Sequence, residues 1–310
     1  MLLESFYSLS CNVESMSAKQ FFIDRYARLG WIYKETQLRQ SIRINQLNAK
    51  SKNLPERLRG SGVELEKIPF LSAGYWINKT KVSVGATAEY LLGMYSIQEA
   101  AAQIPASLFN ALGGKMVLDA CAAPGGKTVQ LADLMGNSGV ITALDVNKQR
   151  LNAMANHLER CHVSNTVVYN VDARQAGMLN RKFQRILLDV PCSGNFAGDG
   201  NWFYRRTIDD VDRNAEVQKA ILKEAVACLL DGGEIVYSTC SLEPEEDELN
   251  MDWAIKNLGL KIQKIDCLGV DGLTEVFGRK LDASVAFCRR IWPAETQGFF
   301  VCKLKKETKQ

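Results

Sequence analysis

Histidine is scarce in this chain, which carries it only at His157 and His162. Serine hydrolase triads and acid–base catalysis by imidazole both require histidine, so the sequence favours neither. The nine cysteines include no Cys-x-x-Cys pair. Because zinc sites and disulfide frameworks depend on such spacings, we expect reduced thiols and no bound metal.

Long apolar runs are missing as well. No run approaches the roughly 20 apolar residues that are needed to cross a bilayer. Residues 1–15 contain Glu4 and Glu14 and no basic start, which is unlike a signal peptide. We therefore expect a cytoplasmic protein that has no membrane partner. As a separate expectation, the chain acts as a monomer.

Charge is unevenly distributed along the 310 residues. The net charge is +3, but residues 1–60 hold ten Lys and Arg against five Asp and Glu, so the rest of the chain sums to −2. A basic N-terminal part is compatible with a polyanionic partner, although a solvated charged surface has the same composition.

The first part of the chain predicts a small mixed α+β domain over residues 1–92. Its expected elements are a helix at 18–32, a strand at 40–47, a short helix at 54–60 and short strands within 63–77. The polar, glycine-containing stretch 78–93 marks the expected boundary. Residues 93–310 then form the second domain.

The second domain alternates strand and helix patterns, which is typical of a parallel sheet covered on both faces. It is expected to begin with an amphipathic helix at 97–112 and to end with a strand at 299–304, paired antiparallel with a strand around 285–288. Between them we expect strands at 116–120, 140–145, 166–171, 185–189 and 233–237, and helices at 126–134, 148–160, 209–230 and from about residue 244.

The first strand of that domain runs into a small-residue loop, Asp119 to Thr128, and then a helix. Small residues let a ligand approach backbone N–H groups at a helix N-terminus. A phosphate-binding loop would need glycine five positions before Gly126, where the chain has Cys121. The dinucleotide fingerprint G-x-G-x-x-G is absent too, so the loop suits a ligand other than a polyphosphate.

Aspartates close the next strands. Asp145 is placed to accept hydrogen bonds from ribose hydroxyls, with Arg150 one helical turn further on, and Asp172 is placed to accept from an adenine amino group. One such aspartate alone is more often a turn or cap residue. Several at successive strand ends favour a nucleoside cofactor without polyphosphate, and S-adenosylmethionine fits this set.

Two cysteines follow the last two strands of the series. Cys192 comes shortly after Asp189, and Cys240 ends the run Tyr237–Cys240. A thiolate that adds to carbon 6 of a pyrimidine makes carbon 5 nucleophilic, so a thiol with a lowered pKa suits methylation at that carbon. Asp189 is placed to hydrogen-bond the N3 and amino edge of the base. The spacing does not rank the two thiols.

These motifs resemble the Sun/Nop family of RNA cytosine-5 methyltransferases, and in particular its archaeal tRNA-type members. The resemblance extends from about Arg43 to Leu304. It is carried by LDACAAPGGKT at 118–128, Asp145 with Arg150, Asp172, LDVPCSG at 188–194, YSTCSL at 237–242, the stretch 90–105 and the closing Gly298-Phe299-Phe300.

The resemblance implies a Rossmann-like class I methyltransferase sheet, mostly parallel with one antiparallel strand, preceded by a small α+β domain that is RRM-like. It implies that Cys240 is the nucleophile, that Cys192 helps to release the product, and that Asp189 lies between cofactor and base. It implies S-adenosylmethionine as the cofactor and RNA as the partner, with tRNA favoured over rRNA. The implied cofactor-binding residues are Cys121, Ala122, Ala123, Pro124, Gly125, Gly126, Lys127, Asp145, Arg150, Asp172 and Asp189.

Two segments depart from the family pattern or lack a clear role in it. Residues 195–206 are not the glycine-arginine loop of bacterial members, and we expect this segment to meet the substrate. The acidic run 245–248 is interpreted as helix capping rather than catalysis. Candidate phosphate contacts are Lys81, Arg205, Arg206, Arg289 and Arg290.

Alternative functions stay open at this point. They are an rRNA cytosine-5 methyltransferase, a DNA cytosine-5 methyltransferase that uses Cys192 as its nucleophile, and an RNA-binding assembly factor without activity.

Overall fold

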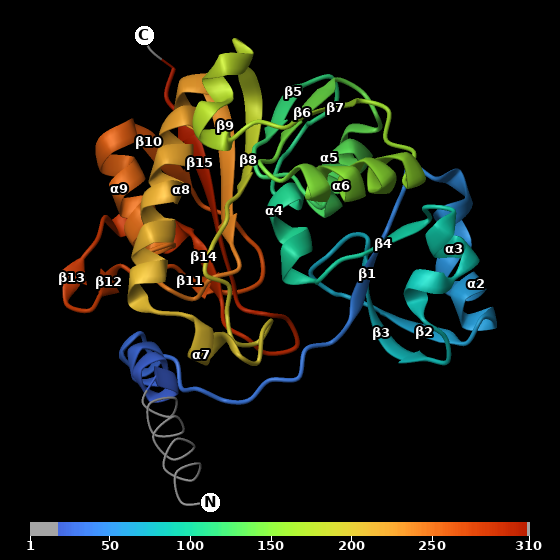
Figure 1. Cartoon of the computed structure of the whole chain (residues 1–310), viewed down its shortest axis with the longest axis horizontal. Helices are drawn as coiled ribbons and strands as arrows, with labels where there is room; N and C mark the ends of the chain where they lie inside the picture. Colours follow the sequence, from blue (N-terminus) through green and yellow to red (C-terminus); the bar gives the residue numbers. More distant parts are fainter. Residues whose placement is uncertain (1–17, 309–310) are drawn as a thin grey trace, which may run out of the picture.

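A computed structural model describes residues 18–308 of the chain, which contain two main sheets (Figure 1). The small sheet is antiparallel, in the order β2-β3-β1-β4. Its elements are β1 (Ser41–Ile44), α2 (Leu54–Gly60), β2 (Val63–Lys67), β3 (Gly74–Thr80), α3 (Ala88–Leu91) and β4 (Tyr95–Ile97). This βαββαβ order is the split arrangement shared by RRM domains, as predicted.

Residues of the small sheet bind it to the rest of the molecule. β4 lies after residue 92 but pairs with β1, with Ile42 opposite Ile97. The predicted domain boundary between residues 92 and 93 stays a prediction. The buried side chain of Arg43 forms an ion pair with Asp133 at 2.7 Å, across to the second domain.

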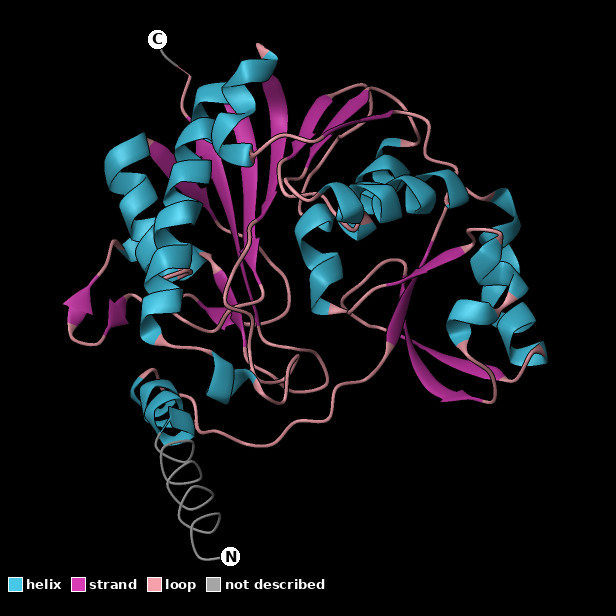
Figure 2. Ribbon diagram, in the orientation of Figure 1, coloured by secondary structure: helices cyan, strands magenta, loops and turns pink. Residues whose placement is uncertain are grey.

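The large sheet has nine strands and confirms the predicted class I architecture (Figure 2). Its central strands are parallel, in the order β9-β8-β5-β6-β7, and β15 runs antiparallel beside β9. The bounds are β5 Met116–Asp119, β6 Val140–Leu144, β7 Thr166–Tyr169, β8 Phe183–Asp189, β9 Leu229–Thr239 and β15 Phe299–Lys306. β14 (Arg289–Ile291) and β10 (Leu260–Gln263) pair with β15, and β11 (Val270–Asp271) pairs with β14. Apart from this sheet, β12 (Glu275–Val276) pairs with β13 (Arg279–Lys280).

Helices cover both faces of the large sheet (Figure 1). α4 (Ile104–Ser107), α5 (Gly126–Met135) and α6 (Lys148–Arg160) lie on one face, and α8 (Ile208–Cys228) and α9 (Glu248–Leu258) on the other. The two main apolar clusters of the core fill these layers. The short α7 (Trp202–Arg205) lies below the sheet in this view.

Two predicted elements are wrong. The predicted helix 97–112 is replaced by β4, a short 3-10 helix at Ala101–Gln103 and the one-turn α4, because Ile97 pairs with β1 and Pro105 has no N–H to continue a helix from upstream. The predicted strand at 285–288 is a 3-10 helix at Ala283–Phe287, which the side chain of Asp282 caps. β14 begins at the next residue but one and does pair antiparallel with β15.

The N-terminal helix does not pack on the small sheet. Within the described residues it runs from 18 to 28, so it ends before the predicted residue 32, and it lies beside α7 (Figure 1). Phe22 and Tyr26 join Phe196, Trp202 and Phe203 in one buried aromatic cluster. Residues 1–15, and the expectation that they are no signal peptide, lie outside the described residues. Within residues 18–308 no helix is both long and apolar enough to span a membrane.

Candidate functional site

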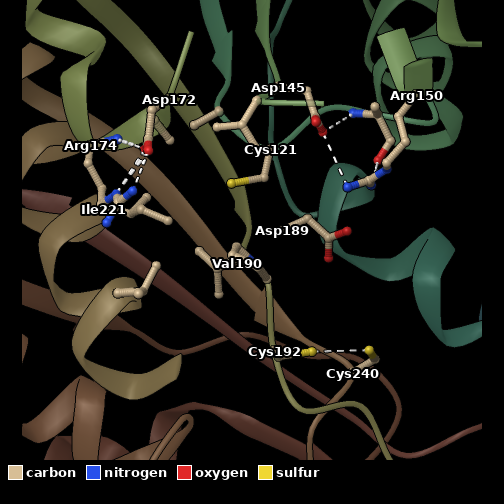
Figure 3. Close-up of a pocket in the computed structure, with 16 residues that line it drawn as sticks. Cys121, Asp145, Arg150, Asp172, Arg174, Asp189, Val190, Cys192, Ile221 and Cys240 are labelled. Atoms are coloured by element: carbon tan, nitrogen blue, oxygen red, sulfur yellow. Dashed lines mark hydrogen bonds and ion pairs between the residues drawn. The ribbon is translucent and has the colours of Figure 1, made fainter. Parts of the chain in front are cut away.

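A cavity of about 340 Å³ opens at the carboxyl ends of the parallel strands (Figure 3). Strand ends of a parallel sheet meet at one edge, and the residues after β5, β6, β7, β8 and β9 therefore converge. Of the predicted site residues, eight line the cavity: Cys121, Ala123, Asp145, Arg150, Asp172, Asp189, Cys192 and Cys240. The other five predicted residues are not part of the lining: Ala122, Pro124 and Gly125 lie in the loop before α5, and Gly126 and Lys127 begin α5 itself.

One wall of the cavity is formed by Asp145 and Arg150. The Asp145 carboxylate is buried and accepts hydrogen bonds from the backbone N–H of Ala123 at 3.2 Å and of Asn147 at 2.8 Å. The Arg150 guanidinium lies 3.5 Å from Asp145 and donates to the Ala123 carbonyl. The carboxylate is therefore fixed in place, and each of its oxygens keeps a further lone pair for a ligand.

Asp172 stands on the opposite wall (Figure 3). Arg174 donates to both of its carboxylate oxygens, with Nε at 3.1 and 3.0 Å. The hydrogen bonds from Arg174 lower the pKa of Asp172. Asp172 is therefore a fixed anion at the rim.

The loop between the walls requires glycine at one position. Gly125 has a φ of +98°, and a Cβ on it would lie 2.9 Å from Cγ of Met154. This close approach turns the chain into α5 and brings Lys127 toward the cavity. Cys121 also faces the cavity, but burial and the nearby Asp119 raise the pKa of its thiol well above the ordinary value, so it stays protonated.

Asp189 lies between the walls and the two other thiols (Figure 3). Its carboxylate accepts from Lys127 Nζ at 2.8 Å and from the Ser238 hydroxyl at 2.8 Å. Each oxygen is thus oriented by one donor and keeps a free lone pair on the cavity side.

Cys192 and Cys240 form a pair at the far end of the cavity, with their sulfur atoms 3.1 Å apart. A hydrogen bond from Cys192 lowers the pKa of Cys240, and the Lys127 ammonium acts in the same direction. The pKa of Cys192 is raised well above its ordinary value by the hydrogen bond to Cys240 and by burial. In this arrangement Cys240 is the more easily formed thiolate and Cys192 its proton donor.

The acidic run 245–248 does not cap a helix. Asp247 precedes α9 but makes no capping hydrogen bond. Its carboxylate instead accepts from the Thr239 hydroxyl at 2.6 Å, next to Cys240. Glu246 accepts from the backbone N–H of Ser193, at 3.1 and 3.0 Å to its two oxygens, next to Cys192. The run therefore holds the two thiol-bearing loops, and the capping interpretation is wrong.

The candidate phosphate contacts separate into two groups. The prediction that Arg290 contacts phosphate is wrong, because its side chain is fully buried and donates to Asp247 and Glu248. Arg289 is mostly buried and pairs with Asp271. Lys81, Arg205 and Arg206 are exposed.

Eight residues that the sequence interpretation did not select as site residues also line the cavity: Ala120, Val146, Ala173, Arg174, Val190, Pro191, Val217 and Ile221. Val146 is apolar, yet its side chain is 63% exposed. Its position directly after Asp145, at the end of a strand that leads to the cavity, is the sequence signal that could have identified it. Val217 and Ile221 come from α8, and their spacing in the sequence indicates only a buried helix face.

Two protein-family models and a solved structure match this chain. A family model described as "16S rRNA methyltransferase RsmB/F" matches residues 106–305, and one described as "N-terminal domain of 16S rRNA methyltransferase RsmF" matches residues 15–100. The chain is similar to a solved structure of a methyltransferase homolog protein from Pyrococcus horikoshii, with a TM-score of 0.81, 36% identity and 87% of each chain covered.

Two curated relatives differ in how much of their length the chain matches. It is 33% identical to the tRNA (cytosine(49)-C(5))-methyltransferase of Pyrococcus abyssi, over 92% of this chain and 95% of the relative. It is 34% identical to the ribosomal RNA small subunit methyltransferase F of Aeromonas salmonicida, over 87% of this chain and 58% of the relative. The chain spans about a third to three fifths of the length of several curated relatives that it matches.

Proposed function

This chain belongs to the family of RsmB/F methyltransferases, and on that premise we propose that it methylates carbon 5 of a cytosine in RNA through a covalent cysteine adduct. The observation that carries the proposal is the convergence of two thiols and Asp189 at adjoining strand ends, beside a cavity with ribose-binding chemistry. Methylation of carbon 5 of cytosine needs both a nucleophile that adds to the base and a group that activates the base for that addition.

The residues of the cavity fit S-adenosylmethionine. Its volume of about 340 Å³ falls within the range of about 300–1,000 Å³ that is usual for small-molecule pockets. Asp145 would hold the ribose, Asp172 would face the adenine edge, and the exposed Val146 offers an apolar surface for the ring. When bound, this cofactor supplies an electrophilic methyl group.

Cys240 is the proposed nucleophile. Its pKa is lowered by the hydrogen bond from Cys192, so the thiolate needed for attack on carbon 6 forms more readily there. Through the lone pairs that Lys127 and Ser238 leave free, Asp189 would accept hydrogen bonds from the amino group of cytosine and from N3 once N3 has taken up a proton. The proton on N3 draws electron density away from carbon 6 and favours addition.

Cys192 is the proposed release residue. Once the Cys240 sulfur is bonded to carbon 6, the proton on carbon 5 must leave before the carbon–sulfur bond breaks. Cys192 lies beside Cys240, and the interaction with the Cys240 sulfur that raises the Cys192 pKa ends when that sulfur is bonded to carbon 6. Cys192 would then release its own proton to solvent, and its thiolate would accept the proton from carbon 5. In the alternative that the chain methylates DNA, Cys192 would be the nucleophile, but its raised pKa makes it the weaker one at neutral pH.

A trapping experiment tests the proposal. The full chain is incubated with S-adenosylmethionine and with 5-fluorocytosine-containing RNA or DNA of the same sequence, since fluorine at carbon 5 blocks release. We expect an adduct with the RNA, located at Cys240 by peptide mass spectrometry. An adduct with DNA at Cys192 would support the alternative, and RNA binding without any adduct or labelled methyl transfer would indicate a non-enzymatic RNA-binding protein.

We propose tRNA as the substrate in preference to rRNA. This rests on the P. abyssi relative, whose name states a tRNA substrate and which the chain matches over nearly its whole length. The second candidate is rRNA, which the relatives matched over part of their length are named for. Bisulfite sequencing of tRNA and rRNA from cells with and without the gene decides between them, because only the true target loses a methylated cytosine.

We further propose that the chain acts as a monomer in the cytoplasm. In support of the monomer, one chain supplies both walls of the cavity and both thiols. Light scattering of the purified chain measures its mass directly, and imaging of a tagged copy measures its compartment.

A further inference from the structure

Residues 195–206 are the segment that the sequence leads us to expect against the substrate, yet their first residue faces the protein interior. Asn195 is 3% exposed and is not among the residues that line the cavity. Phe196, Trp202 and Phe203 follow it into the aromatic cluster of the N-terminal helix. The exposed residues of the segment, which a substrate can reach, are Gly198, Gly200, Asn201, Tyr204, Arg205 and Arg206, so its buried residues have a different role.

The Asn195 side chain joins three segments of the chain. Its amide nitrogen donates to the carbonyl oxygen of Cys240 at 2.7 Å and to that of Gly298 at 3.0 Å. Its amide oxygen accepts from the backbone N–H of Ala197 at 3.0 Å. Both amide hydrogens and the oxygen are thus used, which fixes the orientation of a buried amide.

The turn that leads to Asn195 is also specific. Gly194 has a φ of +74°, a backbone region that favours glycine, and it directs the chain from Cys192 back toward Cys240. Behind Asn195, the ring of Phe196 stacks on Phe203 with centroids 5.1 Å apart. Asn195 therefore lies between a glycine turn that precedes it and a packed aromatic ring that follows it.

The contact falls on the residue that bears the proposed nucleophile. On its N-terminal side, Cys240 is held by β9, where Thr239 pairs with Phe300 of β15 and donates to Asp247. On its C-terminal side, the carbonyl oxygen is held by Asn195. With both peptide groups fixed, the direction of the Cys240 side chain toward Cys192 and Asp189 is fixed as well.

We infer that Asn195 is a positioning residue for Cys240: it sets the direction of the thiol without touching the substrate. The expected effect on the catalytic rate rests on the proposed function, whereas the expected effect on the direction of the Cys240 thiol does not. A displacement of about 1 Å at a reacting group costs on the order of 100-fold in rate, so the loss of the amide donor is expected to slow adduct formation.

Two substitutions separate the roles of the side chain. Asn195→Asp keeps the oxygen that accepts from Ala197 and removes the donor to Cys240, whereas Asn195→Ala removes both. Asn201→Ala is the matched control, because Asn201 lies in the same segment, is exposed and makes no side-chain capping bond to α7. Thermal unfolding identifies any variant that fails to fold, and Asn195→Asp is the variant expected to keep the turn.

The first measurement is the pH dependence of Cys240 alkylation by iodoacetamide, followed by peptide mass spectrometry. In both Asn195 variants a freed Cys240 loses its fixed contact with Cys192, so the midpoint is expected to rise relative to the wild type and Asn201→Ala. Midpoints that are identical in all four proteins would overturn the inference. This readout does not depend on methyl transfer and tests the inference even if the proposed function fails.

The second measurement is single-turnover adduct formation with 5-fluorocytosine RNA. We expect both Asn195 variants to form the adduct about 10–100-fold more slowly, with RNA and cofactor dissociation constants within about threefold of the wild type. Weaker RNA binding with an unchanged adduct rate would instead make Asn195 a substrate contact. A wild-type chain that forms no adduct would contradict the proposed function and leave the alkylation result to decide on Asn195.

Discussion

The sulfur atom of Cys192 lies 3.1 Å from that of Cys240, although the two residues follow different strands of the sheet. In this contact one thiol donates and the other accepts, and the distance alone does not rank them. The hydrogen bond from Cys192 and the Lys127 ammonium both lower the pKa of Cys240, which favours Cys240 as the acceptor and thiolate.

The ionisation of Cys240 should depend on its neighbour. Because the hydrogen bond from Cys192 lowers the Cys240 pKa, Cys192→Ala should raise the pH at which Cys240 reacts with iodoacetamide. Cys302→Ala, which removes a buried cysteine of β15, is the control and should leave the midpoint unchanged. A downward shift in Cys192→Ala would mean that Cys192 is not the donor.

Cofactor binding should depend on Asp145. Replacement of Asp145 by Asn removes the charge that accepts from ribose hydroxyls, and hydrogen bonds to charged groups contribute about 1.5–3 kcal/mol each. We expect the dissociation constant of S-adenosylmethionine, measured by calorimetry, to rise at least about tenfold. Asp212→Asn, at an exposed position on α8, should bind like the wild type; equal affinities for all three proteins would exclude Asp145 from the cofactor site.

Asp119 should make stability fall with rising pH. Burial raises its pKa from 3.8 to about 7, and one of its carboxylate oxygens has no hydrogen-bond partner. The folded state therefore holds a proton that the unfolded state has lost, so stability is greatest below pH 4 and declines through pH 7. Between pH 6 and 8 this should remove about 1.4 kcal/mol of unfolding free energy.

Asp119→Asn tests that linkage, since the variant has no proton to lose. Urea unfolding at pH 6 and pH 8 should give a difference between variant and wild type that shifts by about 1.4 kcal/mol in favour of the variant. A difference that stays constant between the two pH values would show that Asp119 is ionised throughout.

The N-terminal helix should stabilise the loop after Cys240. Arg25 forms ion pairs with the buried Glu243 at 3.0 Å and with Glu245 at 2.8 Å. Arg25→Ala leaves Glu243 buried and unpaired, which typically costs about 3–5 kcal/mol. Arg28 is the matched control, because both guanidinium groups lie 4.6 Å from the Phe277 ring. Arg28→Ala should cost no more than about 1 kcal/mol in urea unfolding.

The cavity could largely be predicted from the sequence because its residues sit where apolar strands end. Asp145, Asp189 and Cys240 each follow a run whose pattern indicates a buried strand, and parallel strands bring their ends together. Val217 and Ile221 could not be found in this way. They reach the cavity from the middle of a long helix, where the pattern shows only that one face is buried.

Charged residues were harder to interpret than apolar ones. Arg290 and the acidic run look like surface charges in the sequence, yet Asp247 and Glu248 enclose Arg290 in the core. No local sequence pattern indicates that Arg290 contacts Asp247 and Glu248. In the same way, the pairing of β4 with β1 overrides the helical pattern after Ile97.

The proposed reaction depends most on which of the two thiols attacks the base. The decisive measurement is the fate of 5-unsubstituted cytosine RNA incubated with Cys192→Ala and Cys240→Ala in the presence of S-adenosylmethionine, followed by denaturing electrophoresis and peptide mapping. We predict that Cys240→Ala forms no adduct, and that Cys192→Ala stops turnover while accumulating an RNA adduct at Cys240. An adduct that disappears in Cys192→Ala and persists in Cys240→Ala would contradict the account.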